Sequence, residues 1–210
     1  MDYLLLLIGF IIAYLLGSVS TSVWVGKWFY DKDVRDEGSG NAGATNTVRV
    51  LGVKAGIPVI IIDILKGYFA VWLMRYFIPD NWSEDTHIYL EIVAGIVAVV
   101  GHTLPLYTGF RGGKGVATLF GAGLALYGWA VVVPLGIFIL TVALTRYVSL
   151  GSLLGGISFP FVVIFMFHIY HPGLIGLAVF AALFIVWTHR TNISRLVRME
   201  ENRISFRKEK

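Results

Sequence analysis

The sequence predicts an all-α integral membrane protein with seven transmembrane helices. Of its 210 residues, 57% are hydrophobic and only 14% are charged, whereas charged residues make up about a quarter of a soluble domain. Apolar stretches of roughly 20 residues recur, and each is long enough to cross about 30 Å of hydrocarbon. The chain has no cysteine, which excludes disulfides and thiolate chemistry.

The apolar stretches give the expected spans in chain order. The first begins beside the acidic residue Asp2, so we interpret it as a true span and not as a cleaved signal peptide. Pro105 ends the third. A nearly unbroken apolar run then extends from Val116 to Leu144, as one long helix or as a hairpin that turns near Gly128. With the hairpin, the expected spans are residues 3–25, 52–77, 88–106, 114–128, 130–146, 150–169 and 172–189.

The basic residues favour the hairpin and set the orientation, because Lys and Arg collect on the cytoplasmic side of membranes. With seven spans, an extracytoplasmic N-terminus and a cytoplasmic C-terminus, 15 of the 17 basic residues lie inside, including those of the tail at 190–210. Six spans would separate the 27–54 loop from that tail. We therefore expect one membrane-embedded domain over residues 1–210, with its active site at the cytoplasmic face.

Two glycine-rich loops carry the strongest functional signal. Residues Glu37 to Asn46 read EGSGNAGATN, and Phe110 to Gly115 read FRGGKG. Glycine lets successive N–H groups turn toward one point, and a neighbouring cation adds charge, so such loops bind phosphate groups. Lys114 stands at the start of a predicted helix, where the N–H groups and the dipole favour an anion. A solvated connector and a cytoplasmic anchor are the alternative interpretations.

A third polar segment follows the last span. His189 and Asn192 are three residues apart, so on a helix they share a face, with Arg195 one turn further. They are candidates for catalysis, and an ordinary interfacial histidine is the alternative. Ser149 and Ser152 either donate to an anion or cap a helix.

Few polar residues fall inside the spans. Asp63 and Lys66 are expected to form a structural ion pair near mid-depth, away from the cytoplasmic loops. Gly17 and the small residues after it are expected to admit a neighbouring helix closely. A transporter for an organic phosphate would need a polar path across all spans, and only Glu91 adds to this buried charge.

Missing motifs narrow the chemistry further. The sequence contains no GxSxG, so a serine-hydrolase elbow is unsupported. It also lacks the HxxxxD pair of many glycerolipid acyltransferases. No acidic cluster suggests a catalytic metal, which disfavours a metal-dependent head-group transferase.

At these residues the chain resembles the bacterial acyl-phosphate:glycerol-3-phosphate acyltransferases, the PlsY family. Three motifs match in order: GS…K…GSGNAGATN…R, GHTLPLYTGFRGGKG and HRTNISRL…E. The resemblance covers nearly the whole chain. Two positions depart from the family pattern: Ser20 stands where Pro is usual, and Met199 stands where Gly is frequent.

The resemblance implies an enzyme of the bacterial inner membrane that catalyses the first acylation of phospholipid synthesis. It would transfer an acyl chain from acyl phosphate to the 1-hydroxyl of glycerol 3-phosphate, giving lysophosphatidic acid and phosphate. Because acyl phosphate is already activated, direct transfer without an acyl-enzyme is expected. The implied partners are the two substrates and the lipid bilayer, with no cofactor, metal, nucleic acid or obligatory protein partner. The alternative function is the organic-phosphate transporter.

The resemblance also implies roles for individual residues. The expected catalytic residues are His189, Asn192, Lys114 and Arg49. The expected substrate- or phosphate-binding residues are Ser39, Gly40, Asn41, Thr45, Asn46, His102, Gly112, Gly113, Gly115, Ser149 and Ser152. Glu201 is expected to be structural. Either His189 or a substrate phosphate would accept the proton of the glycerol hydroxyl.

Overall fold

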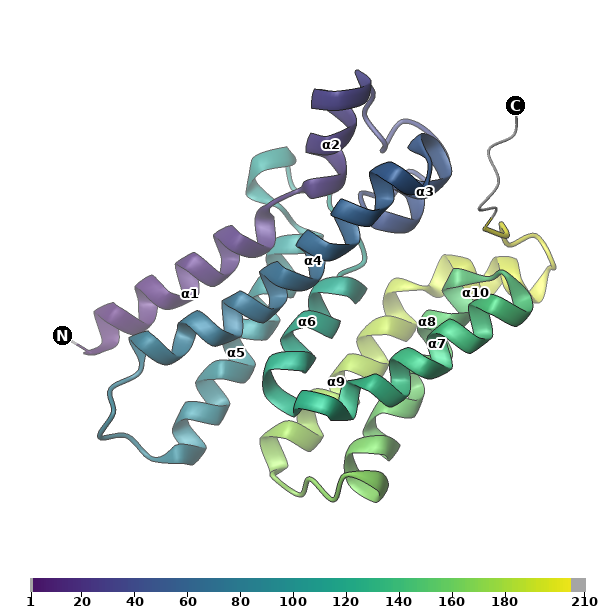
Figure 1. Ribbon diagram of the computed structural model, residues 1–210. Coiled ribbons are helices and arrows are strands. Elements are labelled where there is room, and N and C mark those ends of the chain that lie inside the picture. The colour runs from purple at the N-terminus through teal and green to yellow at the C-terminus, as the bar shows by residue number, and fades with distance from the viewer. Residues whose placement is uncertain (1, 205–210) are drawn as a thin grey trace. The chain divides into compact units, whose positions relative to one another are not determined.

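The computed structural model describes residues 2–204, and every regular element in that range is a helix (Figure 1). The end of the predicted tail, from residue 205 on, lies outside the described residues. The chain forms two compact units, Met1–Leu126 and Tyr127–Lys210. The expectation of a single domain over 1–210 stays a prediction.

The first unit is built on three long helices that pack against one another. Helix α1 lies alongside α5 and α4, and α4 also contacts α5 (Figure 1). Small and apolar side chains, among them Ala13, Ala70, Met74 and Ala98, form a buried core between the three helices. The elements of this unit are α1 (Asp2–Ser18), α2 (Thr21–Tyr30), α3 (Ala44–Leu51), α4 (Val53–Met74), η1 (Arg75–Phe77), α5 (Glu84–Thr103), η2 (Leu106–Thr108) and α6 (Val116–Tyr127), whose last residue falls in the second unit.

Glycines let these helices approach closely. A Cβ added at Gly17 would collide with the carbonyl of Ala98 on α5, and one at Gly67 would collide with the carbonyl of Thr118 on α6. In membranes such small-residue contacts replace the hydrophobic driving force that joins helices in water. The predicted close approach at Gly17 is confirmed.

The second unit is a helical layer in which α8 contacts both α7 and α9 (Figure 1). Gly155 of α8 faces the carbonyl of Pro134 on α7, where a Cβ would approach the oxygen within 2.8 Å. After Pro160, α8 continues as a π-helix, because proline disrupts the regular bond pattern. The elements are η3 (Gly128–Val131), α7 (Val132–Thr145), α8 (Val148–Phe161), η4 (Val162–Met166), α9 (Pro172–Thr188) and α10 (Arg190–Val197).

By length and composition, the described part of the chain holds four helices able to cross a membrane, or up to six if each bent pair is one span. The four segments are Val53–Phe77, Glu84–Thr108, Val116–Thr145 and Val148–Met166. The bent pairs are α1 with α2, at 44°, and α9 with α10, at 60°. The chain is thus an all-helical, multi-pass membrane protein. Seven spans and the orientation of the termini remain predictions.

The run that was predicted as a helix or a hairpin is interrupted at Gly128. Its φ of 56° lies in the left-handed region, and residues Gly128–Val131 form a 3₁₀ turn between α6 and α7. Three helices were not foreseen as separate elements. They are α2, which the predicted first span merged with α1, α3, which begins inside the first glycine loop, and α10, which follows His189.

Candidate functional site

The first glycine loop is organised by the side chain of Asn46. The side chain is buried, its Oδ1 accepts a bond from the Ser39 N–H at 2.8 Å, and its Nδ2 donates to the carbonyls of Val34 at 2.6 Å and Glu37 at 3.2 Å. The loop is therefore folded back onto the first turn of α3. The observed partners of Asn46 are backbone groups of its own loop, and its contact with phosphate stays a prediction.

Glycine is required in this loop for two separate reasons. Gly38 and Gly40 have φ values of 64° and 70°, which disfavour other residues. A Cβ at Gly38 would also collide with Oδ1 of Asn46 and would lie 3.4 Å from Cδ of Arg49. The loop thus lies against α3, with Gly38 close to the side chains of both Asn46 and Arg49.

Asn41 has a distinctive environment within this loop. Its Oδ1 is buried and has no hydrogen-bond partner among the described residues. A buried polar atom of this kind normally has a partner, so Asn41 has capacity for a ligand. Thr45 lies in the first turn of α3, directly after Gly43 and Ala44.

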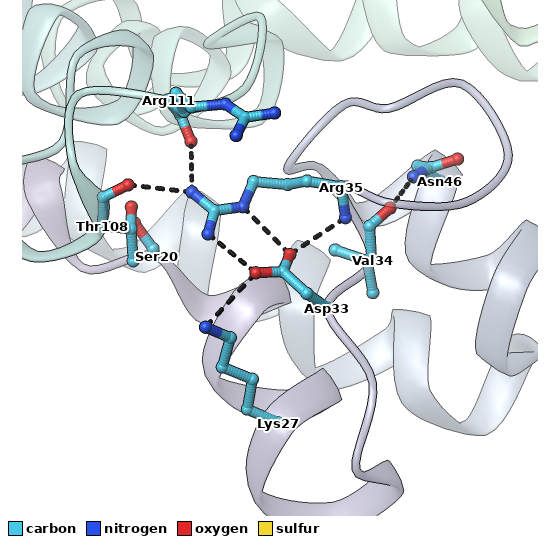
Figure 2. A network of polar contacts seen from close by, with 8 residues as sticks. All are labelled: Ser20, Lys27, Asp33, Val34, Arg35, Asn46, Thr108 and Arg111. Atoms are coloured by element: carbon cyan, nitrogen blue, oxygen red, sulfur yellow. Dashed lines mark hydrogen bonds and ion pairs between the residues drawn. The ribbon is translucent and has the colours of Figure 1, made fainter.

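A network of polar contacts connects the first loop to the second (Figure 2). Asp33 accepts bonds from Arg35 through both carboxylate oxygens, at 2.9 Å and 2.7 Å, and Lys27 lies 3.3 Å from the same carboxylate. The hydrogen bond from Arg35 holds the pKa of Asp33 well below its ordinary value. Arg35 in turn donates to the carbonyls of Thr108 at 2.8 Å and Arg111 at 3.3 Å.

The second loop is anchored to the end of α5. The N–H groups of Gly112 and Gly113 donate to the carbonyls of Thr103 and His102, at 3.2 Å and 3.1 Å. A Cβ at Gly113 would collide with the His102 ring and would lie 2.7 Å from the carbonyl oxygen of Ala42, which belongs to the first loop. The absence of a side chain at Gly113 thus permits the two loops to approach one another. Lys114 follows directly.

The loop ends at a tight turn into α6. Gly115 has a φ of 76°, and its carbonyl accepts a bond from the Leu119 N–H at 2.8 Å. Helix α6 begins at Val116, so Lys114 lies two residues before the helix and not in its first turn, where the predicted span 114–128 placed it.

The buried ion pair of α4 contacts the break between α1 and α2 and the end of α5. Lys66 and Asp63 pair at 2.8 Å as predicted. However, Lys66 also donates to the carbonyl of Val19, and Asp63 lies 3.3 Å from Thr21 Oγ1 and 3.8 Å from Nδ1 of His102. The expectation that the pair lies near mid-depth, away from the loops, stays a prediction.

His102 lies directly against Gly113 of the second loop, and its carbonyl accepts a bond from the Gly113 N–H. Its side chain is buried, and its Nδ1 has no hydrogen-bond partner in the described part of the chain. The role of His102 in substrate binding, expected from the second motif, stays a prediction.

In the second unit, several candidate site residues donate hydrogen bonds to the carboxylate of Glu201. Its carboxylate accepts bonds from Ser149 Oγ at 2.8 Å, from Asn192 Nδ2 at 2.7 Å and from Arg195 Nε at 3.0 Å. The carboxylate side chain is only 6% exposed. These contacts link the starts of α8 and α10, which agrees with the structural role expected for Glu201.

The backbone before Glu201 turns sharply at the position where the family often has glycine. Met199 has a φ of 60°, and the Glu200 N–H donates to the carbonyl of Arg195 at 2.8 Å. This left-handed conformation explains why glycine suits the position. The other departure, Ser20, bonds the hydroxyl of Thr108 at 2.7 Å.

A backbone carbonyl orients the ring of His189. Its Nδ1 lies 2.9 Å from the carbonyl oxygen of Ile185. A carbonyl only accepts hydrogen bonds, so Nδ1 carries a proton and donates it to this bond. His189 directly precedes α10, Asn192 lies in the first turn of α10, and both side chains are buried.

The two candidate serines differ in their partners. Ser149 donates its single hydroxyl proton to Glu201, whereas Ser152 donates to the carbonyl of Val148 one turn earlier, at 3.0 Å. Either hydroxyl must change its partner before it can donate to a phosphate. Their role as phosphate contacts stays a prediction.

Sequence reasoning missed Asp33, Arg35 and Thr108 as parts of the site. The contacts of Arg35 with Thr108 and Arg111 join segments that are more than 70 residues apart, so no local motif links them. The charged stretch before EGSGNAGATN was the available signal. Among the described residues, no group of three His, Asp or Glu side chains is arranged to hold a metal ion.

Comparisons with known proteins agree along nearly the whole chain. The profile of the family described as "Glycerol-3-phosphate acyltransferase" matches residues 7–199. A protein of that name from Listeria monocytogenes serotype 4a (strain HCC23) is 44% identical over 196 residues, which cover 93% of this chain and 95% of the relative. One from Chlorobium chlorochromatii is 39% identical, over 94% of this chain and 96% of the relative.

Solved structures give the same result. The glycerol 3-phosphate form of PlsY, described as an integral membrane glycerol 3-phosphate acyltransferase, superposes with a TM-score of 0.84 at 32% identity, over 95% of this chain and 96% of that one. The lysophosphatidic acid form of PlsY superposes with a TM-score of 0.79 at 31% identity, over 96% of each chain.

Proposed function

Because the chain belongs to the glycerol-3-phosphate acyltransferase family, the PlsY family, we propose that it transfers an acyl chain from acyl phosphate to the 1-hydroxyl of glycerol 3-phosphate. The products are lysophosphatidic acid and inorganic phosphate. The reaction takes place at the inner membrane of a bacterium and supplies the first acylated intermediate of phospholipid synthesis.

The observation that supports this proposal best is the joined pair of glycine loops in the first unit. Both substrates of the proposed reaction carry a phosphate. Gly113 allows the second loop to approach the first at Ala42, and Arg35 connects them by hydrogen bonds. Lys114 and Arg49 bring positive charge to these loops and neutralise the phosphate groups, while backbone N–H groups orient them.

The chemical step needs no protein nucleophile. The glycerol hydroxyl attacks the carbonyl carbon of the acyl phosphate, a new ester C–O bond forms, and the bond between the acyl carbon and the phosphate oxygen breaks. The electron pair leaves with inorganic phosphate. Correct positioning of two reactants contributes about 7–11 kcal/mol to a reaction of this kind, and fixed donors stabilise the charge that develops on oxygen.

The proton of the attacking hydroxyl requires an acceptor. His189 suits this role because an imidazole is the most frequent general base in proteins, and the bond between its Nδ1 and the Ile185 carbonyl orients the ring. A phosphate oxygen of a substrate is the second possible acceptor. Asn192, held by Glu201, contacts glycerol 3-phosphate, and the unpartnered Oδ1 of Asn41 accepts a bond from a substrate hydroxyl.

We also propose seven spans with the loops at the cytoplasmic face. The left-handed turn at Gly128 supports separate spans before and after it, and the positive charge of the loops supports the orientation. Because the chain has no cysteine, single cysteines introduced at Asp36, Arg111 and Arg190 report the topology directly. Labelling of all three by an impermeant thiol reagent from the cytoplasmic side only agrees with the proposal, and labelling of any one from outside contradicts it.

The choice of donor tests the proposed function. Purified protein in detergent is given glycerol 3-phosphate with palmitoyl phosphate or with palmitoyl-CoA, and lysophosphatidate is measured. We expect product from palmitoyl phosphate alone. Product from the CoA thioester at an equal rate would refute the acyl-phosphate donor, and an acyl group trapped on the protein would refute direct transfer.

A further inference from the structure

We propose that Arg35, held in place by Asp33, is a positioning residue that fixes the second glycine loop against the first, so that one phosphate meets both. The inference rests on the proposed function for its catalytic consequence. Its structural part, the joining of the two loops, is independent of the reaction.

The geometry around Asp33 makes Arg35 rigid. One carboxylate oxygen accepts bonds from the backbone N–H and Nε of Arg35, at 3.0 Å and 2.9 Å, and the other accepts from a terminal nitrogen at 2.7 Å. This is the two-pronged arrangement of guanidinium and carboxylate, which adds directional specificity to the charge attraction. The two side chains are only 12% and 14% exposed, so solvent screens the pair weakly.

The remaining terminal nitrogen of Arg35 points at the second loop (Figure 2). It donates to the carbonyls of Thr108 and Arg111, which lie three residues apart. Between them the backbone is in the left-handed region at both Gly109, φ 69°, and Phe110, φ 58°. Residues other than glycine rarely adopt this region, because the side chain approaches the following carbonyl oxygen too closely. Arg35 therefore bridges a turn whose own conformational preference opposes it.

That turn directly precedes Gly112, Gly113 and Lys114. The far side of the loop is held by the bonds of Gly112 and Gly113 to the end of α5. Besides Arg35, the near side of the loop is held by the Phe110 N–H, which donates to the carbonyl of Pro105 at 2.9 Å, and by the hydroxyl pair of Ser20 and Thr108. The guanidinium thus supplies the charge-assisted anchor on the near side.

The Asp33–Arg35 pair, referred to below as the clamp, is also connected to Asn46, the residue that organises the first loop. Val34, between Asp33 and Arg35, is fully buried, and its carbonyl accepts the 2.6 Å bond from Asn46. Asn46 also holds Ser39. One short segment, residues 33–35, therefore connects Ser39 in the first loop with the turn that positions Lys114 in the second.

Kinetics of Arg35 variants test the catalytic consequence. We expect Arg35→Gln to raise KM for glycerol 3-phosphate at least about tenfold, because loss of a charge-assisted bond has roughly this effect. The kcat at saturation should stay within about threefold, because Arg35 does not touch the reacting atoms. Arg35→Lys keeps the positive charge but loses the planar guanidinium with its several fixed donors. Its KM should therefore lie between those of the wild type and Arg35→Gln.

Lys32→Gln is the matched control. Lys32 lies in the same segment and forms an ion pair with Glu37 at 2.8 Å, but both side chains are about half exposed. We expect its KM to stay within about twofold of the wild type. A KM for Arg35→Gln within twofold of wild type, or an equal change in Lys32→Gln, overturns the proposal.

A spin-label measurement tests whether Arg35 joins the two loops. It requires neither catalytic turnover nor the correct folding of one particular variant. Cysteines replace Asp36 and Leu106, exposed residues on either side of the clamp in a chain that has no native cysteine. We expect the distance distribution between the labels to broaden or shift in Arg35→Gln and in Asp33→Asn. An unchanged distribution in Asp33→Asn, with unchanged KM, overturns the proposal even if Arg35→Gln does not fold. A wild-type protein that makes no lysophosphatidate refutes the proposed function instead, while the labels still test the clamp.

Discussion

Replacement of Asn46 by alanine tests whether this side chain organises the first glycine loop. The change removes three hydrogen bonds, of 2.8, 2.6 and 3.2 Å, from a residue that is 2% exposed. Each such bond contributes about 1 kcal/mol net, so we expect the free energy of unfolding to fall by about 3 kcal/mol. The freed loop should also bind glycerol 3-phosphate more weakly, because Ser39 loses its anchor.

The assay combines denaturant unfolding in detergent with steady-state kinetics. Thr47→Val is the control, since Thr47 is the next residue of α3, is also buried, and makes one intrahelical bond to the Gly43 carbonyl at 3.1 Å. Its loss should be about 1 kcal/mol. If Asn46→Ala raised KM while the free energy of unfolding stayed within 1 kcal/mol of wild type, the side chain would act on substrate and the loop-organising explanation would be refuted.

Four further predictions test individual parts of the site. Lys114→Ala should raise KM for a phosphorylated substrate roughly 10- to 150-fold, the value of a charge-assisted bond, and loss of folding instead would make the lysine an anchor. His189→Gln should lower kcat by roughly 10²- to 10⁴-fold if the imidazole is the base, whereas a retained kcat would assign the proton to a substrate phosphate. Gly113→Ala should cost roughly 1–3 kcal/mol by overpacking against His102, while Gly136→Ala, where a Cβ meets no atom within 4 Å, should not destabilise, as unfolding in detergent will show. The lowered pKa of Asp33 means that its stabilising effect is complete above the ordinary value of 3.8 and is lost as pH falls through the folded value. The stability difference between wild type and Asp33→Asn should therefore be constant from about pH 5 to 8 and shrink only below about pH 4, and a decline near neutral pH would contradict this assignment.

The apolar pattern predicted most of the long helices, because a membrane span depends on local composition. The second, third and last predicted spans correspond closely to α4, α5 and α9. The bend between α1 and α2, after Ser18, was harder to predict. At this bend Lys66 of α4 donates a hydrogen bond to the carbonyl of Val19. That contact joins residues that are far apart in the sequence, so the residues next to Val19 do not reveal it.

For the functional residues, too, the sequence predicted the local motifs but not the tertiary contacts. Glycine, lysine and asparagine at fixed spacing predicted the two loops and the His189 segment. The partners of these residues were not predictable, since Asn46 turned toward its own loop and Ser149 toward Glu201. Such choices depend on which backbone and carboxylate groups the fold brings within hydrogen-bond distance.

Under the proposed function, this protein acylates glycerol 3-phosphate and consumes one acyl phosphate for each acyl group transferred. The most direct measurement is the stoichiometry of the purified protein in liposomes, with phosphate and lysophosphatidate quantified from one reaction. We predict one phosphate released for each lysophosphatidate formed, and none beyond the uncatalysed rate when glycerol 3-phosphate is omitted. Phosphate release without lysophosphatidate, or uptake of glycerol 3-phosphate into the vesicles with no acylated product, would contradict the account.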